Sequence, residues 1–263
     1  MRLTAVLLFL SAAGLAIAQP TVGGVVNGAS FDKKNPIGTG GLVSIFGTNL
    51  AAAPAGADTI PLSTTLGGVT VQFVNGSKTI DAPLLYLQSN QINAVVPWDL
   101  LPGGVSAQVN VVVTNKSGTS TAFPVQASQF SPGVFSIGNL AAVQNVDGSL
   151  AQPAGSIPGR TTHPAKVGSV VIIYATGLGP VTPAVPDGAI PPSGTTANTI
   201  HKPTVYFGGH SAAIQFSGLS PQFVGVYQLN VVVPDIVPKD DVPLQISLGG
   251  IATSSSITVA VSQ

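Results

Sequence analysis

The chain has 263 residues, a formal net charge of zero and charged side chains at only 7% of its positions. It lacks Cys, which excludes disulfides, and it has no basic cluster of the kind that phosphate binding requires, which argues against a nucleic-acid partner. Gly (31) and Pro (22) are abundant, Glu is missing, and Val, Ile and Thr are frequent, so the composition predicts an all-β protein. Disorder is disfavoured because 44% of the residues are hydrophobic and fall in short, separate runs.

Residues 1–18 have the pattern of a signal peptide. Arg2 supplies the positive start, Ala5–Leu10 begins an apolar stretch, and Ala16-Ile17-Ala18 is a small-residue cleavage site. Cleavage after Ala18 leaves a secreted chain, extracellular or attached to the cell surface. The alternative is a retained N-terminal anchor. No later stretch is long and apolar enough to span a membrane, so no membrane span is expected after cleavage.

Short strand-like runs, separated by Gly, Pro, Asn and Ser, follow in two sets, a spacing typical of sandwiches or barrels. The first set comprises residues 42–46, 69–74, 84–87, 91–96 and 109–114. The second comprises residues 170–175, 204–207, 212–216, 226–233, 244–248 and 256–261. No window after residue 18 keeps the 3.6-residue apolar period of a helix.

The two sets resemble each other in sequence. The run QINAVVP at 91–97 matches QLNVVVP at 228–234, and GGLVSIFGTNL at 40–50 matches GSVVIIYATGL at 168–178. Because a third match, residues 69–73 with 203–207, keeps the same order, we infer an internal duplication. Each copy has the size of an immunoglobulin-like domain. The sequence therefore predicts two tandem immunoglobulin-like β-sandwiches, at residues 19–128 and 167–263.

Residues 129–166 are predicted to connect the two domains. Asp147-Gly148 lies between apolar stretches, which is a strong hairpin signal, so a β-hairpin is expected at about 134–150. The Pro- and Gly-rich residues 152–164 are expected to form an extended loop.

One turn position differs between the copies in an informative way. Asn49 in the first copy corresponds to Gly177 in the second. Asn and Gly are the residues that most readily adopt a positive φ, so a left-handed backbone conformation is expected at both positions.

The run GLVSIFGTNL at 41–50, the VYFG at 205–208 and the Val-Pro ends of two strands at 96–97 and 233–234 resemble IPT/TIG domains, an immunoglobulin-like family. Residues 22–262 also resemble an uncharacterised C-terminal domain of secreted acidobacterial proteins. That resemblance rests on VNGASF (26–31), IFGTNL (45–50), SPGVF (131–135) and YATGLGP (174–180). It implies export and a double immunoglobulin-like architecture, and no activity. The family's domain usually follows other modules, whereas this one stands almost alone.

Candidates for catalysis are sparse. The histidines are His163, His201 and His210, and no G-x-S-x-G elbow or H-E-x-x-H pattern is present. A hydrolase with a histidine base and an Asp would require residues that only the tertiary fold could bring together. No catalytic residue, metal ligand or cofactor is therefore assigned. Asp240-Asp241 is expected in a solvated turn, with weak calcium binding as the alternative.

Trp98 and Asp99 are the candidate binding residues. Trp98 is the sole Trp of the chain and follows a strand end where the second copy has Asp235. A loop aromatic beside a sandwich can stack on sugar rings, and the alternative is that Trp98 packs at the domain edge or at the interface. The sequence thus favours a non-catalytic structural, adhesive or binding module whose partner is a protein or a polysaccharide at the cell surface. A carbohydrate-binding accessory module is the second hypothesis.

Overall fold

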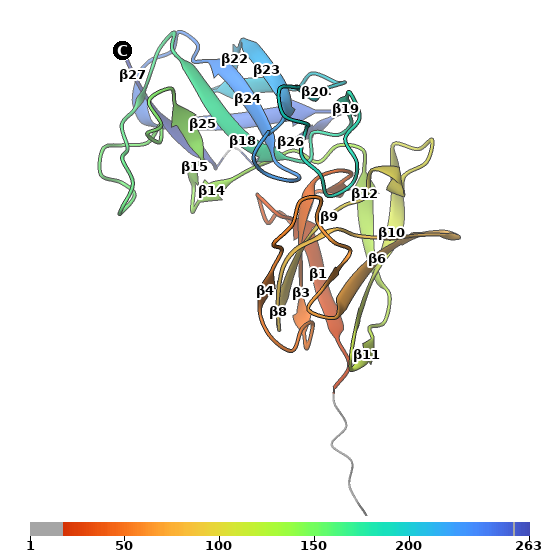
Figure 1. The fold of residues 1–263 in the computed structure, drawn as a ribbon. Coiled ribbons are helices and arrows are strands. Elements are labelled where there is room, and N and C mark those ends of the chain that lie inside the picture. Colours follow the sequence, from red (N-terminus) through yellow and green to blue (C-terminus); the bar gives the residue numbers. More distant parts are fainter. Residues whose placement is uncertain (1–17, 255) are drawn as a thin grey trace, which may run out of the picture.

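The computed structural model describes residues 18–254 and 256–263, and these form two β-sandwiches, one after the other along the chain (Figure 1). The predicted signal peptide lies outside the described residues apart from Ala18. Within the described range the sole helical element is the short 3-10 helix η1 (Trp98–Leu100). The all-β class and the tandem immunoglobulin-like sandwiches expected from the sequence are confirmed. No described helix is long and apolar enough to cross a bilayer.

The first sandwich packs a sheet of order β1-β3-β9-β8-β4 against a sheet of order β2-β12-β10-β6-β5, which β7 and β11 extend. The bounds of its strands are β1 Thr21–Asn27, β2 Ile37–Gly38, β3 Leu42–Thr48, β4 Ala55–Gly56, β5 Thr65–Leu66, β6 Val69–Asn75, β7 Lys78–Asp81, β8 Leu84–Gln88, β9 Gln91–Val95, β10 Ser106–Asn115, β11 Gly118–Thr119 and β12 Phe123–Ser128.

The second sandwich repeats this plan. One sheet has the order β13-β18-β24-β23-β20-β19, with β16 also paired to β18, and the other has the order β14-β15-β27-β25-β21-β22, with β17 and β26 beside it. The bounds are β13 Gly133–Val134, β14 Ser136–Ile137, β15 Leu140–Ala141, β16 Val143–Asn145, β17 Ala165–Lys166, β18 Val170–Thr176, β19 Val181–Thr182, β20 Asn198–Thr199, β21 Thr204–Phe207, β22 His210–Ala212, β23 Ile214–Leu219, β24 Tyr227–Val232, β25 Lys239–Leu248, β26 Ile251–Ala252 and β27 Thr258–Ser262.

Strand pairing supports the internal duplication residue by residue. In the first sandwich Leu42 pairs with Val95, and in the second sandwich their sequence counterparts Val170 and Val232 pair with each other. The next four residue pairs along these strands correspond in the same way. A one-residue slip would reverse every side chain between core and solvent, so the shared register means that corresponding residues face the two cores, Val43 and Ile45 in the first and Val171 and Ile173 in the second.

The expected turn at Asp147-Gly148 is present, but a single bridge, Gln144 with Leu150, joins its two sides. The two-stranded hairpin of segment 129–166 is instead β14–β15, which turns at residues 138–139. The segment also contributes strands to both sheets of the second sandwich, because β13 and β16 pair with β18 and β17 pairs with β27. β16 occupies the place beside β18 that β1 occupies beside β3. Residues 133–145 therefore supply the first strand of the second copy as well as the link between the copies.

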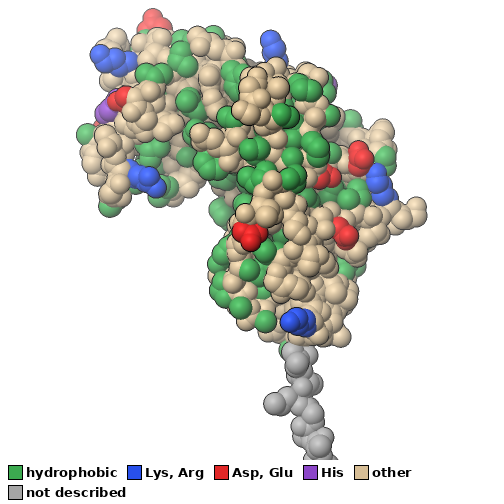
Figure 2. Space-filling view, in the orientation of Figure 1, with side chains coloured by type: hydrophobic (Ala, Val, Ile, Leu, Met, Phe, Trp, Pro, Cys, Tyr) green, Lys and Arg blue, Asp and Glu red, His purple; other side chains and the backbone are tan. Residues whose placement is uncertain are grey.

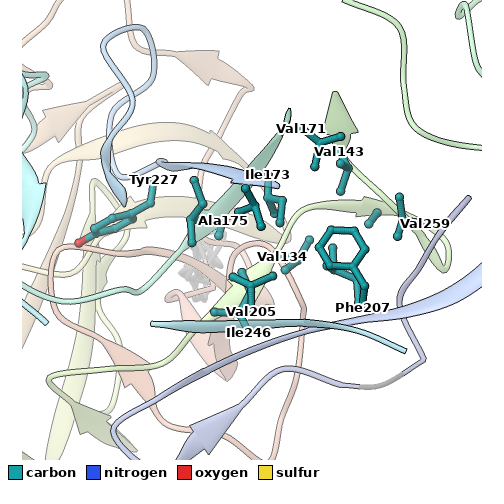
Figure 3. Packing of buried hydrophobic residues seen from close by; sticks show 14 of the residues in the cluster. Val134, Val143, Val171, Ile173, Ala175, Val205, Phe207, Tyr227, Ile246 and Val259 are labelled. Carbon is teal, nitrogen blue, oxygen red and sulfur yellow. The ribbon is translucent and has the colours of Figure 1, made fainter. Parts of the chain in front are cut away.

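The cores follow from alternation along the strands. In β6, Val69, Val71 and Phe73 are buried while the residues between them are half-exposed, the pattern of a strand with one face in a core. The second core surrounds Phe207 and Ile173, and Val134 and Val143 from the linking segment pack into it (Figure 3).

The two sandwiches meet through a buried interface that combines apolar and polar contacts. Leu42, Leu62 and Val95 of the first sandwich cluster with Val224 and Val226 of the second. Beside them the wholly buried Thr176 hydroxyl accepts a hydrogen bond from Leu42 N (2.8 Å) and donates one to Gly225 O (2.7 Å). Asn27 Nδ2 donates to Ser131 O at 2.8 Å. Because an unmade hydrogen bond is costly when buried, these contacts fix how the sandwiches join.

The left-handed turn predicted from the Asn49–Gly177 correspondence is confirmed, with φ of 54° at Asn49 and 73° at Gly177. At Gly177 the fold exploits the missing side chain a second time, because a Cβ there would overlap the carbonyl oxygen of Ser131. The second copy therefore has Gly where the first tolerates Asn.

Candidate functional site

Trp98 lies at the junction of the two sandwiches. Strand β9 ends at Val95, and η1 begins at Trp98 after its N-cap residue Pro97. The backbone N–H of Trp98 donates to Asp187 Oδ1 of the second sandwich at 2.9 Å. The half-buried indole packs against the second core and lies directly over Gly40, where a Cβ would overlap its ring carbons. Gly40 has a φ of 68°, so both its backbone conformation and the ring above it require glycine.

A cavity of about 280 Å³ opens beside the indole between the two sandwiches. Its walls come from both copies: Thr39, Trp98, Asp99, Leu101, Gly104 and Gln129 on one side, and Pro180, Val181, Ala184 and Val185 on the other. The expected packing of Trp98 at the interface is compatible with the prediction that it binds a ligand, since the same ring packs against the second core and lines the cavity.

Three polar side chains of the cavity lining, Thr39, Gln129 and Asp99, have no hydrogen-bond partner among the described residues. Thr39 is 4% exposed, its backbone N–H donates to Ser128 O at 3.1 Å, and its hydroxyl has no hydrogen-bond partner among the described residues. Among the described residues, Gln152 Oε1 is the one side-chain nitrogen or oxygen that is both fully enclosed and without a hydrogen-bond partner. The Thr39 hydroxyl is therefore not fully enclosed, and solvent reaches it. The Gln129 amide and the Asp99 carboxylate are likewise unpaired within residues 18–254 and 256–263. Unpaired polar groups that converge on an apolar cavity are typical of a ligand site.

The charges near the cavity are weakly negative. Asp99 is exposed at the rim, and Lys78 Nζ donates to its backbone carbonyl at 2.7 Å. Burial raises the pKa of Asp187, which Trp98 N–H opposes and the charge of Asp99 reinforces. No Lys or Arg is among the described lining residues, so the cavity is unsuited to an anion.

A Ser–His–Asp cluster, which the sequence patterns did not reveal, lies at the far end of the second sandwich. His163 Nε2 is 2.8 Å from Asp147 Oδ2 and 2.8 Å from Ser149 Oγ. Ser149 Oγ also lies 2.7 Å from Asp147 Oδ1, to which it donates. The hydrogen bond from His163 lowers the pKa of Asp147, and the same bond raises the pKa of His163.

This cluster does not have the geometry of a nucleophilic triad. In a triad the Asp holds one imidazole nitrogen and the other faces the serine. Here Asp147 and Ser149 share Nε2, and Nδ1 faces the carbonyl of Pro164 at 3.0 Å. Ser149 Oγ donates directly to the carboxylate, so the imidazole does not lie between the serine and the Asp as it does in a triad. The cluster instead ties the Asp147-Gly148 turn to the start of β17.

The remaining sequence candidates lie apart from one another. His201 makes an edge contact with Phe130, with ring centroids 5.1 Å apart, and His210 is exposed in β22. The prediction of a solvated turn at Asp240-Asp241 is wrong in part, because both residues are exposed but belong to strand β25, where the pairing with β27 shifts register. Among the described residues no three metal-ligating side chains of His, Cys, Asp or Glu cluster together.

Comparisons with known proteins give no family assignment. No family model matches the chain, and no curated protein matches it in sequence. Among solved structures it is similar to the SGBP-B of a Bacteroides ovatus mixed-linkage glucan utilization locus, in complex with a mixed-linkage heptasaccharide (14% identity, TM-score 0.36, 86% of this chain and 42% of that chain). It is also similar to the plexin A4 extracellular region (13% identity, TM-score 0.25, 98% of this chain and 20% of that chain). A third similar structure contains tandem immunoglobulin domains of titin (10% identity, TM-score 0.20, 93% of this chain and 99% of that chain). The chain spans less than half the length of the first two, and at these TM-scores the likenesses add nothing to the case for a site.

Proposed function

We propose that the chain is a non-catalytic binding module of the cell surface or extracellular space, and that its ligand enters the cavity between the two sandwiches at Trp98 and Asp99. The observation that carries this proposal is Thr39, a nearly buried residue that lines the cavity and whose hydroxyl, still reached by solvent, has no hydrogen-bond partner among the described residues. Water can satisfy this hydroxyl in the free protein, and a ligand that displaces the water and reproduces its hydrogen bond can bind there.

The proposal is non-catalytic because the chemistry that would support an enzyme is engaged elsewhere. The Ser149 hydroxyl and the Asp147 carboxylate bond to each other and to His163. The cavity itself contains Asp99, Gln129 and Thr39, which offer no pair of carboxylates and no nucleophile with a base.

An adhesive role is compatible with the same site. Charged side chains are few and scattered over the face seen in Figure 2, and several large apolar side chains of the protein are well exposed, among them Val105, Val146 and Val237. A surface with little electrostatic repulsion associates readily. The module is therefore proposed to act within an assembly of polymers or proteins at the cell surface.

Export and domain bounds belong to the same proposal. Cleavage after Ala18 would release the mature chain, and the resemblance to the secreted acidobacterial domain agrees with export from a bacterial cell. Because β13, β16 and β17 pair within the second sandwich, we place the units at residues 19–128 and 129–263.

Trp98 provides the test, because the chain has one Trp and it lines the cavity. Soluble extracellular polymers and tryptophan-free proteins from the native host are titrated into residues 19–263 while Trp98 fluorescence is recorded. A saturable change that Thr39→Val weakens supports the proposal. Binding that leaves both the fluorescence and the Thr39→Val affinity unaltered would move the site elsewhere.

A further inference from the structure

The cavity at Trp98 has properties that narrow its ligand to one chemical class. Building on the proposed function, we infer that it accommodates a single ring of a neutral saccharide, with the indole against one face of the ring and Thr39, Gln129 and Asp99 bonded to its hydroxyl groups. Size, aromatic surface, hydrogen-bonding capacity and charge each contribute to this inference.

The size of the cavity suits one six-membered ring. Its volume is about 280 Å³, whereas an engineered protein cavity of about 150 Å³ binds benzene. The additional volume accommodates the ring substituents of a pyranose. Pockets for larger organic ligands occupy about 300–1,000 Å³, so a single ring rather than an extended oligosaccharide is expected inside.

The indole supplies the surface on which such a ring would lie. Trp98 is held in place by its backbone bond to Asp187 (2.9 Å), by contact with the second core and by Gly40 beneath it. The face of an aromatic ring is electron-rich, and the axial C–H groups of a pyranose carry partial positive charge. A ring fixed before binding loses little conformational entropy when the ligand arrives.

The polar groups match hydroxyl groups in number and kind. The Thr39 hydroxyl can donate and accept, the Gln129 amide can do both, and the Asp99 carboxylate accepts. None of these side chains has a hydrogen-bond partner in the described parts of the chain. A sugar hydroxyl both donates and accepts, so a single ring can satisfy all of these groups.

The charge distribution favours a neutral ring over a charged one. An anionic sugar would approach Asp99 and the half-buried Asp187 without any Lys or Arg among the described lining residues. A cation would gain from Asp99 and the indole, but Lys78 lies at the backbone of Asp99 and opposes it. A quaternary ammonium nitrogen also has no N–H to donate to Thr39 or Asp99.

The experiment is a titration of residues 19–263 with glucose, xylose, galactose, mannose and N-acetylglucosamine, followed by Trp98 fluorescence. Sorbitol serves as the acyclic polyol control, glucuronate as the anionic probe and choline as the cationic probe. The deciding variant is Thr39→Val, which keeps the shape of the side chain and removes the hydroxyl. Thr121→Val, at an exposed threonine outside the cavity, is its matched control.

We expect saturation by at least one neutral ring and none by sorbitol, with the affinity weakened about three- to tenfold in Thr39→Val and unchanged in Thr121→Val. Replacement of Trp98 would disturb the interface, so Asp99→Asn serves as the second variant, with a similar weakening expected. Saturation by choline or glucuronate without any neutral sugar would overturn the saccharide inference. The saccharide inference would also be wrong if no small molecule changed the fluorescence while host polymers still did, but the proposed function would then survive. If neither the small molecules nor the host polymers changed the fluorescence, the saccharide inference and the proposed function would both be wrong.

Discussion

Two polar clusters of the molecule differ in a way that composition does not reveal. The Ser149–His163–Asp147 cluster contains the residue types of a hydrolase, yet its side chains bond to one another. The cavity at Trp98 contains ordinary residues, yet Thr39 is nearly buried and its solvent-reached hydroxyl has no partner in the described residues. Groups that are already bonded stabilise a fold, while open groups can receive a ligand. This difference identifies the cavity at Trp98, rather than the Ser149–His163–Asp147 cluster, as the candidate site.

The largest expected loss of stability comes from filling the space between Gly40 and the indole of Trp98. Gly40→Ala places a Cβ inside the ring of Trp98 at a φ of 68°. Backbone strain and overpacking together are expected to lower the free energy of unfolding by about 2–4 kcal/mol. Gly76→Ala, at a φ of 59° with no atom near the new Cβ, should lose only about 1–2 kcal/mol. Urea denaturation measures both, and equal losses would mean that the indole is free to move away.

A smaller effect is expected at the polar centre of the interface. Thr176→Val leaves Leu42 N–H and Gly225 O without their buried partner, and the expected loss is about 1–3 kcal/mol. The exposed Thr121→Val should change stability by less than about 0.5 kcal/mol. Should Thr176→Val match this control, the Thr176 bonds would contribute nothing to the junction.

The Ser–His–Asp cluster should affect stability only modestly and in a pH-dependent way. The pKa of Asp147 lies below its ordinary value of 3.8, so its contribution is present above about pH 4 and is lost as the pH falls further. The pKa of His163 lies above 6.5, so its contribution is present below that pH and is lost as the pH rises through the raised pKa. The denaturation midpoint of His163→Gln should therefore differ most from wild type between about pH 4 and 6.5.

His210→Gln, at an exposed histidine in β22, is the control for that profile and should show no such window. Ser149→Ala should leave binding at the Trp98 cavity unchanged. A flat difference between His163→Gln and wild type across this pH range would contradict an ion pair that stabilises the turn.

The smallest effect is expected at Asp240 and Asp241. Both are exposed in β25 and no third metal-ligating side chain joins them in the described residues. Asp240→Asn with Asp241→Asn should alter stability by less than about 0.5 kcal/mol, and calcium should not shift the thermal midpoint of either protein. A midpoint that calcium raises in the wild type alone would restore the calcium alternative.

Much of the fold could be predicted because local rules and the duplication agreed. The register of Leu42 with Val95 recurs at Val170 with Val232, and short strand-like runs in the sequence had already predicted all four strands. The Asn49–Gly177 correspondence predicted a positive φ because few residues tolerate one. The part played by residues 133–145 was missed, since β13 to β16 are too short for a periodicity to emerge.

The candidate site was only half accessible from sequence. The uniqueness of Trp98 drew attention to it, and Asp99 is its neighbour. Thr39 and Gln129 carry no signal, because their importance comes from burial and from the lack of a partner, which exist only after the sandwiches dock. The same holds for Ser149 and His163, which the loop between β16 and β17 brings together.

Affinity electrophoresis of wild type, Thr39→Val and Ser149→Ala through gels that carry plant, fungal and bacterial polysaccharides tests the contrast between the two clusters most directly. The open cavity predicts that at least one polymer retards wild type and Ser149→Ala equally and retards Thr39→Val less. Loss of retardation in Ser149→Ala with full retardation of Thr39→Val would contradict it and would assign the binding to the Ser–His–Asp cluster.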